Sequence, residues 1–331
     1  MATRAENGEV VLAKGATLRT WVAEWLPERA GRRRRESTVS AYAYRLNTYV
    51  LPLIGGIRLR ELTSLDVEDM AHALARKGLS HSTIKGCLVA LSACLHDAKR
   101  GSHLATNPAV GVEVPETARP TAEASAPTIE QVAALLDKVG GTYLEALSLL
   151  LLSTGARIGE ALAARWSEVD LDSGSWLVSQ TLTRGRDGSV RIGDRRKSGD
   201  GRRLSLSPDA VTALREQRRR VAQARLHAGG AWHDHDLVFP SSIGTPQDSS
   251  NVRADFRPVA ASVGWPGSFH AFRHFVASVG LSALPTAVVS KQLGHKRATL
   301  TTDVYGHLLP DDSAQVAALV SGLVSRQRAA K

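Results

Sequence analysis

The chain has 331 residues, 43% of them hydrophobic, which is the size and composition of a globular protein with about two domains. Its formal net charge is +10. Residues 1–119 hold 17 Lys and Arg against 12 Asp and Glu, and the remainder holds 25 against 20, so both parts are basic. A basic charge spread in this way indicates a polyanionic partner, although charge alone does not separate DNA from RNA or an anionic membrane.

The sequence argues against a membrane or secreted protein. The longest apolar run, at residues 147–152, falls far short of the roughly 20 residues that cross a bilayer, and the amino end shows no apolar signal segment. The only cysteines, Cys87 and Cys94, stand about two helical turns apart on one expected helix, too far for a disulfide. We expect both thiols to be reduced and buried in a cytoplasmic protein.

Residues 17–112 are expected to form a helical bundle. Apolar residues recur there at three- and four-residue steps, the period of helices that bury one face. The second helix is expected to begin near Ser37 and to be ended by Pro52, Gly55 and Gly56, and two further helices are expected to begin at the capping residues Thr63 and Ser80. The pattern therefore predicts a small bundle of about four helices.

Two segments are expected to lie outside the folded domains. Residues 1–16 are polar and are typical of a loosely ordered tail. Residues 113–127 are rich in Pro, Ala, Thr and Glu and carry few large apolar side chains, which is typical of a linker. We therefore place the domain boundary in this second segment.

Residues 128–331 are expected to form a second domain, mainly helical with a small antiparallel sheet. Thr128 has the features of a helix cap, and apolar helices follow to about residue 164. Three short segments, at 176–183, 189–192 and 203–206, have the composition of strands, and helical patterns resume from Pro208. The predicted fold class is therefore mainly α, a helical bundle followed by an α+β domain.

Arg157 lies in T-G-A-R-I-G-E, directly after an apolar run that is expected to be a buried helix. An arginine at such a place needs an anionic partner. The partner could be a phosphate, because the planar guanidinium meets two phosphate oxygens at once. It could also be Glu160, three residues on along a helix, in a structural ion pair.

His270 and Arg273, in F-H-A-F-R-H, stand three residues apart and so on one face of a helix. His295, in Q-L-G-H-K, follows a turn that would end a helix and present the imidazole. Preorganised Arg and His donors stabilise the negative charge that builds up on a phosphodiester during cleavage. The neighbouring His274 is expected to point away from the phosphate and to make a structural hydrogen bond.

Tyr305 stands ten residues after His295, in T-T-D-V-Y-G-H. A phenol is a weak nucleophile, with an ordinary pKa of about 10, and needs a base or a cationic surround. The alternative role, a core aromatic near the carboxyl end, fits poorly with its polar neighbours Asp303 and His307. The set predicts attack of a tyrosine on a phosphodiester without metal, cofactor or ATP, and the sequence has no G-x-x-x-x-G-K-[ST] loop.

Lys197 lies in R-R-K-S-G-D-G-R-R, between two expected strands. At a hairpin tip its ammonium could protonate the leaving 5′ oxygen as a general acid. Arg195 and Arg196 are rivals for this role, and a lysine in a polar turn is commonly only solvated.

Two further clusters carry charge. The run Arg32, Arg33, Arg34 and Arg35 precedes a long helix and is expected to contact DNA phosphates, with a solvated lead-in to that helix as the alternative. The segment His233–Asp236 combines metal-ligand types but has no further ligands at a recognisable spacing, so no metal site is expected.

The chain resembles the tyrosine recombinases, the family of phage integrases and Xer-type enzymes. The resemblance covers nearly the whole chain and includes the stretch L-S-H-S-T-I-K-G-C-L-V-A-L-S-A-C-L-H-D-A-K-R of the helical core-binding domain. Six expected active-site positions are filled in order and in similar local contexts: Arg157, Lys197, His270, Arg273, His295 and Tyr305.

The resemblance implies a core DNA-binding domain at residues 17–112 and a catalytic domain at residues 128–331 that clamp duplex DNA. It implies a 3′-phosphotyrosine intermediate, with His270 as the base, and strand exchange between two sites through a Holliday junction in a homotetramer. An excisionase or a host DNA-bending factor could be a further partner. Many phage integrases carry an arm-binding domain ahead of the core-binding domain; only residues 1–16 precede it here, so a full arm-binding domain is not expected.

Two other classes of protein share part of this pattern. A type IB topoisomerase would use similar chemistry but would relax DNA without joining two sites. A catalytically idle DNA-binding protein would have lost Tyr305 or an arginine of the site, and none is missing.

A helix is predicted at the carboxyl end. Asp311 and Asp312 stand at its start, and it either packs on its own domain or, as the resemblance suggests, docks in a neighbouring subunit. Its apolar stripe has helical spacing and consists of Val316, Leu319, Val320, Leu323 and Val324.

Overall fold

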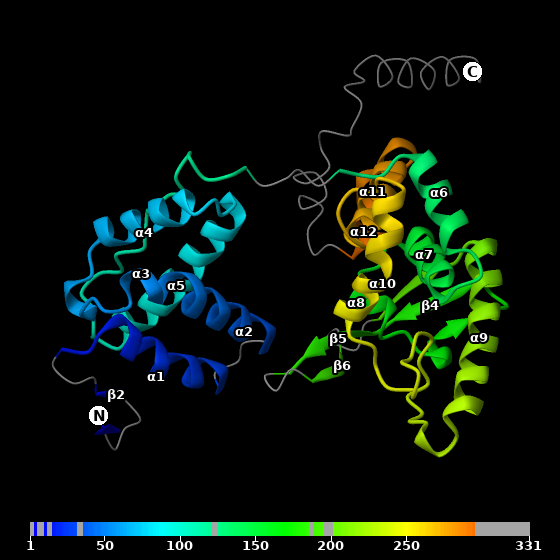
Figure 1. Ribbon diagram of the computed structural model, residues 1–331, viewed down its shortest axis with the longest axis horizontal. Helices are drawn as coiled ribbons and strands as arrows, with labels where there is room; N and C mark the ends of the chain where they lie inside the picture. The colour runs from blue at the N-terminus through cyan, green and yellow to red at the C-terminus, as the bar shows by residue number, and fades with distance from the viewer. Residues whose placement is uncertain are drawn as a thin grey trace, which may run out of the picture. The chain divides into compact units, whose positions relative to one another are not determined.

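The computed structural model describes residues 3–4, 10–11, 15–31, 36–120, 125–185, 189–194 and 201–294. The chain divides into two compact units (Figure 1). The first comprises Met1–Glu123 with Arg184–Ser189, and the second comprises Ala124–Thr183 with Val190–Lys331. Each unit has a hydrophobic core of its own.

The first unit is a helical bundle around a core that includes Trp21, Leu46 and Leu91. The bundle predicted from the apolar periodicity is confirmed. Its elements are β1 (Thr3–Arg4), β2 (Val10–Val11), α1 (Leu18–Gly31), α2 (Glu36–Arg45), a π-helical turn (Leu46–Val50), α3 (Leu51–Ile54), a 3-10 turn (Leu59–Glu61), α4 (Ser64–Arg76) and α5 (His81–Arg100).

Capping side chains begin the last two helices of this bundle. Thr63 accepts the backbone N–H of Asp66, and the Asp66 carboxylate accepts the N–H of Thr63, a reciprocal capping box at the start of α4. Ser80 accepts the N–H of Thr83 at the start of α5. Both helices begin where the capping residues predicted them.

The second predicted helix is divided in the structure. After α2 comes a π-helical turn, in which the N–H of Leu51 donates to the carbonyl of Leu46, and α3 follows with Pro52 in its first turn. Pro52 has no N–H to give to the preceding turn. The wider turn before it lets Leu46 and Val50 both face the core, where each is fully buried. Pro52 therefore lies inside the helical segment, which ends at Gly55, one of the residues expected to end it.

Residues 109–119 pack on the first unit. Ala109 and Ala118 are buried in its core, and Val112 and Val114 pack against that core. The expected linker comprises residues 113–127. Its first half therefore takes part in the packing of this unit, because its few small apolar side chains pack in or against the core.

The second unit combines helices with short strands. Its elements are α6 (Ile129–Val139), α7 (Tyr143–Thr154), α8 (Ile158–Ala161), a 3-10 turn (Trp166–Glu168), β3 (Val169–Asp170), β4 (Ser175–Val178), β5 (Gln180–Arg184), β6 (Val190–Asp194), β7 (Arg202–Ser205), α9 (Pro208–Ala228), a 3-10 turn (Gly229–Ala231), α10 (Ser249–Ser262), α11 (His270–Ala283) and α12 (Thr286–Leu293).

The sheets of the second unit are small. Strands β3, β4 and β7 form one antiparallel sheet in that order, with Trp176 of β4 opposite Val169 on one side and Leu204 on the other. Strands β5 and β6 form a separate pair. The predicted fold class, a helical bundle followed by an α+β domain with a small antiparallel sheet, is confirmed.

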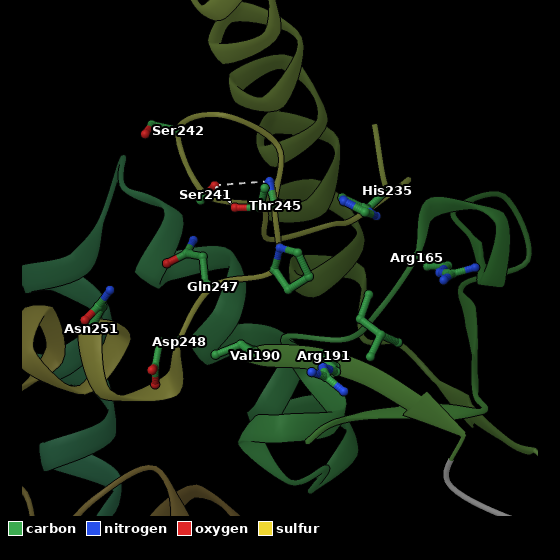
Figure 2. A pocket seen from close by; sticks show the side chains of 12 residues that line it. Arg165, Val190, Arg191, His235, Ser241, Ser242, Thr245, Gln247, Asp248 and Asn251 are labelled. Atoms are coloured by element: carbon green, nitrogen blue, oxygen red, sulfur yellow. Dashed lines mark hydrogen bonds between the residues drawn. The ribbon is translucent and has the colours of Figure 1, made fainter. Parts of the chain in front are cut away.

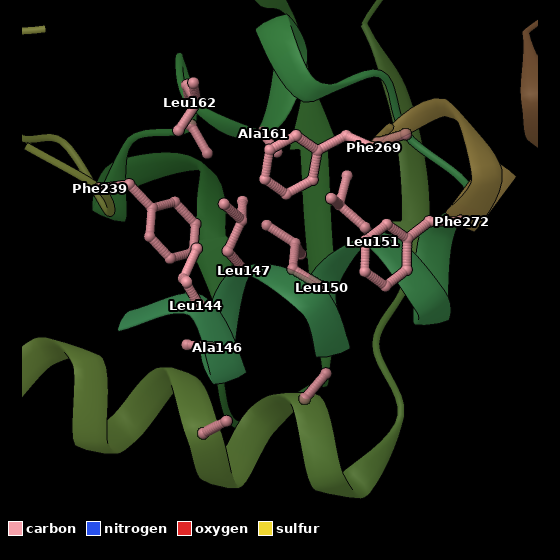
Figure 3. Packing of buried hydrophobic residues seen from close by; sticks show 14 of the residues in the cluster. Leu144, Ala146, Leu147, Leu150, Leu151, Ala161, Leu162, Phe239, Phe269 and Phe272 are labelled. Atoms are coloured by element: carbon pink, nitrogen blue, oxygen red, sulfur yellow. The ribbon is translucent and has the colours of Figure 1, made fainter. Parts of the chain in front are cut away.

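Helix α7 is the centre of the second core. It is apolar on nearly every side, and α9 and α11 pack against it. Its Leu147 and Leu150 are fully buried, and Phe269 and Phe272 close over the same cluster (Figure 3). This enclosure determines where the C-terminal end of α7 lies, and the predicted site begins there.

Across the segments that the structure describes, we find no helix with the length and apolar character of a membrane span.

Candidate active site

Gly155 makes the turn that presents Arg157. Helix α7 ends at Thr154, and Gly155 follows in the left-handed conformation, with φ of 63°, that favours glycine. A Cβ on Gly155 would lie 2.8 Å from Cδ2 of Leu293 in α12 and 3.1 Å from Cγ1 of Val276 in α11. The absence of a side chain therefore lets α11 and α12 approach the turn closely.

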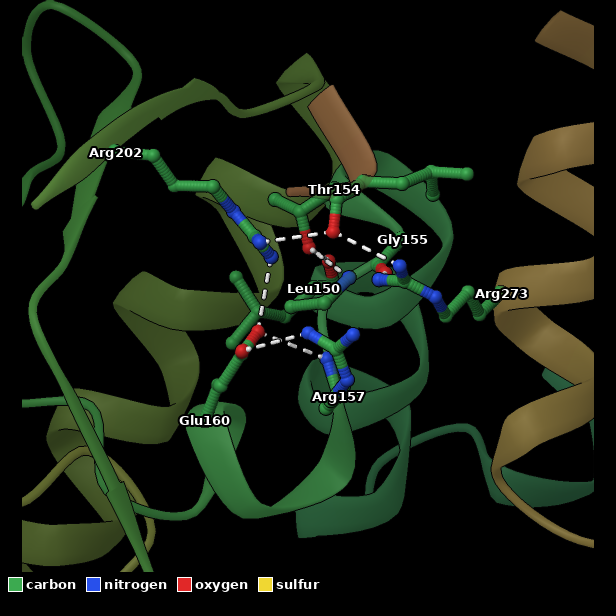
Figure 4. Close-up of polar contacts among 9 residues, drawn as sticks. Leu150, Thr154, Gly155, Arg157, Glu160, Arg202 and Arg273 are labelled. Atoms are coloured by element: carbon green, nitrogen blue, oxygen red, sulfur yellow. Dashed lines mark hydrogen bonds and ion pairs between the residues drawn. The ribbon is translucent and has the colours of Figure 1, made fainter. Parts of the chain in front are cut away.

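Arg157 stands at the start of α8 and is paired with Glu160. Its Nη1 donates to Oε1 of Glu160 at 3.2 Å, and its backbone N–H donates to Oε2 at 3.1 Å (Figure 4). The Glu160 side chain is 2% exposed, whereas that of Arg157 is 46% exposed. The ion pair with Glu160, one of the two partners that the sequence allowed for Arg157, is present. It anchors the Arg157 side chain, which still reaches the surface.

Arg273 lies on α11 and is buried, with 1% of its surface exposed. Its Nη1 donates to the carbonyl oxygen of Gly155 at 2.9 Å and its Nη2 to that of Leu293 at 2.8 Å. These two carbonyl acceptors fix the orientation of the guanidinium group. Because one acceptor is the turn that precedes Arg157, the structure brings the two predicted arginines together (Figure 4).

Arg202 joins this group, which the sequence motifs did not predict. Its side chain is 10% exposed, its Nη2 lies 2.9 Å from Oε2 of Glu160, and its Nη1 donates to the carbonyl oxygen of Leu293 at 2.9 Å. Strand alternation is the signal that could have found it. Arg202 is in phase with Leu204 and Leu206, which are both buried, and a guanidinium on a buried face must find acceptors.

His270 begins α11 and lies against His274. The two ring centroids are 4.7 Å apart and the rings meet edge to face. His274 is buried with its ring on His270, because a four-residue step along a helix returns to the same face. Its expected orientation away from the phosphate stays a prediction.

The pKa of His270 is lowered from its ordinary value to about 4. Burial of the ring is the largest cause, although the residue as a whole is exposed, and the positive charges of His274, Arg273 and Arg157 follow. The ring is therefore neutral at neutral pH and can accept a proton. A bound phosphate would offset the cations and raise the pKa again, towards the range in which a general base works.

Several predicted groups lie outside the described residues: Lys197, His295, Tyr305, the run Arg32–Arg35 and the apolar stripe at 316–324. Two of them are close in sequence to the described site. Lys197 precedes Arg202 by five residues, and His295 follows Leu293 by two. The roles of all these residues stay predictions.

The acidic residues of the His233–Asp236 segment have structural partners. Oδ2 of Asp234 lies 3.0 Å from Nη1 of Arg225, and Oδ2 of Asp236 accepts the backbone N–H of Ser167 at 2.9 Å. Both carboxylates therefore help to hold this loop on the second unit.

A groove of about 840 Å³ opens beside β6 (Figure 2). Strand β6 pairs with β5, and β5 lies against α8, where a Cβ on Gly159 would meet Oγ1 of Thr181 at 3.1 Å. The groove is thus connected through β6 and β5 to the helix that begins after Arg157. Its polar lining includes Arg165, Arg191, His235, Ser241, Ser242, Thr245, Gln247 and Asn251.

Residues 127–311 match the phage integrase family, and residues 17–75 match the N-terminal SAM-like domain of phage integrases. The chain belongs to the phage integrase family. It is a tyrosine-type site-specific recombinase, and this assignment favours the recombinase over the topoisomerase-like alternative.

Two relatives of this recombinase illustrate the match. An integrase of Streptomyces ambofaciens is 30% identical over 309 residues, which cover 91% of this chain and 78% of the relative. A XerC-like tyrosine recombinase of Caldanaerobacter subterraneus subsp. tengcongensis is 25% identical over 322 residues, which cover 92% of this chain and 82% of the relative.

Solved structures share the fold. The integrase of transposon Tn1549, in complex with a circular intermediate DNA, has a TM-score of 0.76 and 18% identity over 92% of this chain and 99% of that one. A lambda integrase tetramer bound to a Holliday junction has a TM-score of 0.63 and 18% identity over 88% of this chain and 78% of that one.

Proposed function

We propose that this recombinase cleaves duplex DNA by attack of Tyr305 on a phosphodiester held by Arg157 and Arg273. The observation that carries the proposal is the convergence of these two guanidinium groups at the Gly155 turn, beside a neutral His270 ring. Guanidinium forks meet non-bridging phosphate oxygens in pairs and stabilise the charge that builds up in the transition state.

The proposed reaction proceeds in two transfers. Tyr305 Oη attacks the phosphorus while His270 accepts its proton, so that a 3′-phosphotyrosine bond forms. The bond from phosphorus to the 5′ oxygen breaks, and Lys197 donates a proton to that oxygen. A 5′ hydroxyl of a second site then attacks the phosphotyrosine and releases Tyr305. The number of phosphodiester bonds is unchanged, so the exchange requires no energy source.

We propose that the chain acts as a homotetramer on two duplex sites and passes through a Holliday junction. The support is the shared fold with the lambda integrase tetramer bound to such a junction. The predicted C-terminal helix would supply the contact between neighbouring subunits.

The groove beside β6 is proposed to face the DNA. Its connection to α8 through β6 and β5 would place it along the backbone that passes the scissile phosphate. Arg165 and Arg191 are suited to phosphate contacts, and the amide of the exposed Asn251 is suited to a base edge.

Covalent trapping tests the proposal. The probe is a duplex that the Tyr305→Phe variant selects by binding from a random-sequence pool, nicked next to the cleavage position so that the released strand diffuses away. The wild-type chain should form a denaturant-resistant adduct on it, and the Tyr305→Phe variant should bind it equally well without forming one. An adduct on the variant would refute the nucleophile, and no adduct with the wild-type chain would refute the proposed function.

A further inference from the structure

The guanidinium group of Arg202 donates to two acceptors. Each of these acceptors also accepts a hydrogen bond from one of the two arginines of the site. Its Nη2 lies 2.9 Å from Oε2 of Glu160, whose Oε1 accepts from Arg157 at 3.2 Å. Its Nη1 donates at 2.9 Å to the carbonyl oxygen of Leu293, which also accepts from Arg273 at 2.8 Å. Each of the two site arginines therefore shares an acceptor with Arg202 (Figure 4).

We propose that Arg202 is a positioning residue of the cleavage reaction, which sets the separation of the Arg157 and Arg273 guanidinium groups. It acts through Glu160 and Leu293, because its charge is paired with the buried Glu160 carboxylate, which also accepts from Arg157. The inference rests on the proposed function, in which the two arginines bind the scissile phosphate.

The backbone makes Arg202 a firm anchor. In β7 it lies opposite Val178 of β4, within the three-stranded sheet. It reaches from there to a carboxylate 42 residues away in sequence and a carbonyl 91 residues away. Lys197 is five residues from this anchor, and His295 is two residues from Leu293. Arg202 thus ties the sheet to Leu293. It connects the segment that follows the predicted acid, Lys197, with the segment that precedes the second predicted histidine, His295.

An arginine is required for this task. The two contacts come from different nitrogens of one planar group, which is held to both acceptors at once. A lysine would keep the charge beside Glu160, but its single nitrogen is a point charge and does not reproduce the fork. Charge alone should therefore not restore the positioning.

The test compares Arg202→Met and Arg202→Lys with the wild-type chain by covalent trapping on the nicked duplex. The scissile phosphate is made as each phosphorothioate diastereomer in turn, so that sulfur replaces one non-bridging oxygen at a time. The ratio of the two cleavage rates then reports how the guanidinium groups are aligned with the phosphate. We expect both variants to react about 10- to 100-fold more slowly, with a changed ratio. Affinity for the intact duplex should change little, because other phosphate contacts remain.

Arg203→Met is the matched control. Arg203 neighbours Arg202 in β7 but is exposed on the opposite face, where its Nη1 donates to Oγ of Ser175 at 2.9 Å. This variant should keep the wild-type rate and ratio. Amide hydrogen exchange in α7 and α11 shows whether each variant is folded. If Arg202→Met is not, Arg202→Lys, which keeps a positive charge beside Glu160, is tested alone.

Two results would overturn the inference. One is cleavage by the folded Arg202 variants at the wild-type rate. The other is a rate lowered by the same factor for both diastereomers, since an unchanged ratio means that the alignment of the two arginines did not depend on Arg202. A wild-type chain that forms no adduct would instead refute the proposed function, and this inference with it.

Discussion

Replacing Gly155 by alanine should destabilise the second unit and slow cleavage by the molecules that stay folded. The left-handed conformation costs a residue with a Cβ about 1–2 kcal/mol. The new Cβ would also lie 2.8 Å from Cδ2 of Leu293 and 3.1 Å from Cγ1 of Val276, and such overpacking costs about 1–3 kcal/mol. The free energy of unfolding should therefore fall by about 2–5 kcal/mol.

Gly174→Ala separates the two causes. Gly174 has a similar φ of 61°, but its Cβ would approach no heavy atom closer than 3.5 Å, so only the conformational cost of about 1–2 kcal/mol applies. Amide hydrogen exchange in α7 and α11 measures the loss in each variant, and covalent trapping at saturating duplex measures the cleavage rate.

The carbonyl of Gly155 holds Arg273, so moving α11 and α12 away from the turn should lower the rate about 10-fold or more in Gly155→Ala. Gly174→Ala should leave the rate unchanged. If the two variants lost equal stability and cleaved equally fast, the close approach at Gly155 would not position the site.

Three further predictions concern single groups. Arg157→Ala and Arg273→Ala should each lower the cleavage rate about 10²-fold or more while DNA affinity falls much less, as binding and trapping assays would show; an equal fall in affinity would make them ordinary binding residues. The pKa of His270 is held at about 4 in the folded chain, below the ordinary 6.5 of the unfolded chain. As the pH falls, His270 is therefore protonated in the unfolded chain before it is protonated in the folded chain. The stability that His270 contributes should thus be complete above about pH 6.5 and decline towards pH 4, and His270→Gln should make the decline shallower; an NMR titration of the ring with an ordinary midpoint would contradict this. Burial raises the pKa of Cys87 to about 11, and Cys87 and Cys94 are both fully buried, so neither should react with a thiol reagent at pH 8 until the protein is unfolded; rapid modification of the native chain would refute their place in the core.

Signals that act over a few residues were readable from the sequence. The capping boxes at Thr63 and Thr128 begin α4 and α6, because the side chain and the N–H that it accepts are three residues apart. The apolar periodicity located the helices of both units, and the order and local contexts of the basic residues and Tyr305 identified the family. Each of these signals can be read from a short stretch of the chain or from the order in which such stretches follow one another.

The contacts that shape the site were decided by tertiary structure. Arg202 meets a carboxylate 42 residues away and a carbonyl 91 residues away, and Arg273 reaches Gly155 across 118 residues. Residues 113–119 look like a linker by composition, yet Ala118 is buried in the core of the first unit. The sequence by itself determined which elements form and which chemistry the chain carries, because capping, periodicity and motif order act locally. The tertiary structure decided which arginines share an acceptor. A buried polar group must form a hydrogen bond, and its partner is the group that a distant segment of the folded chain brings beside it.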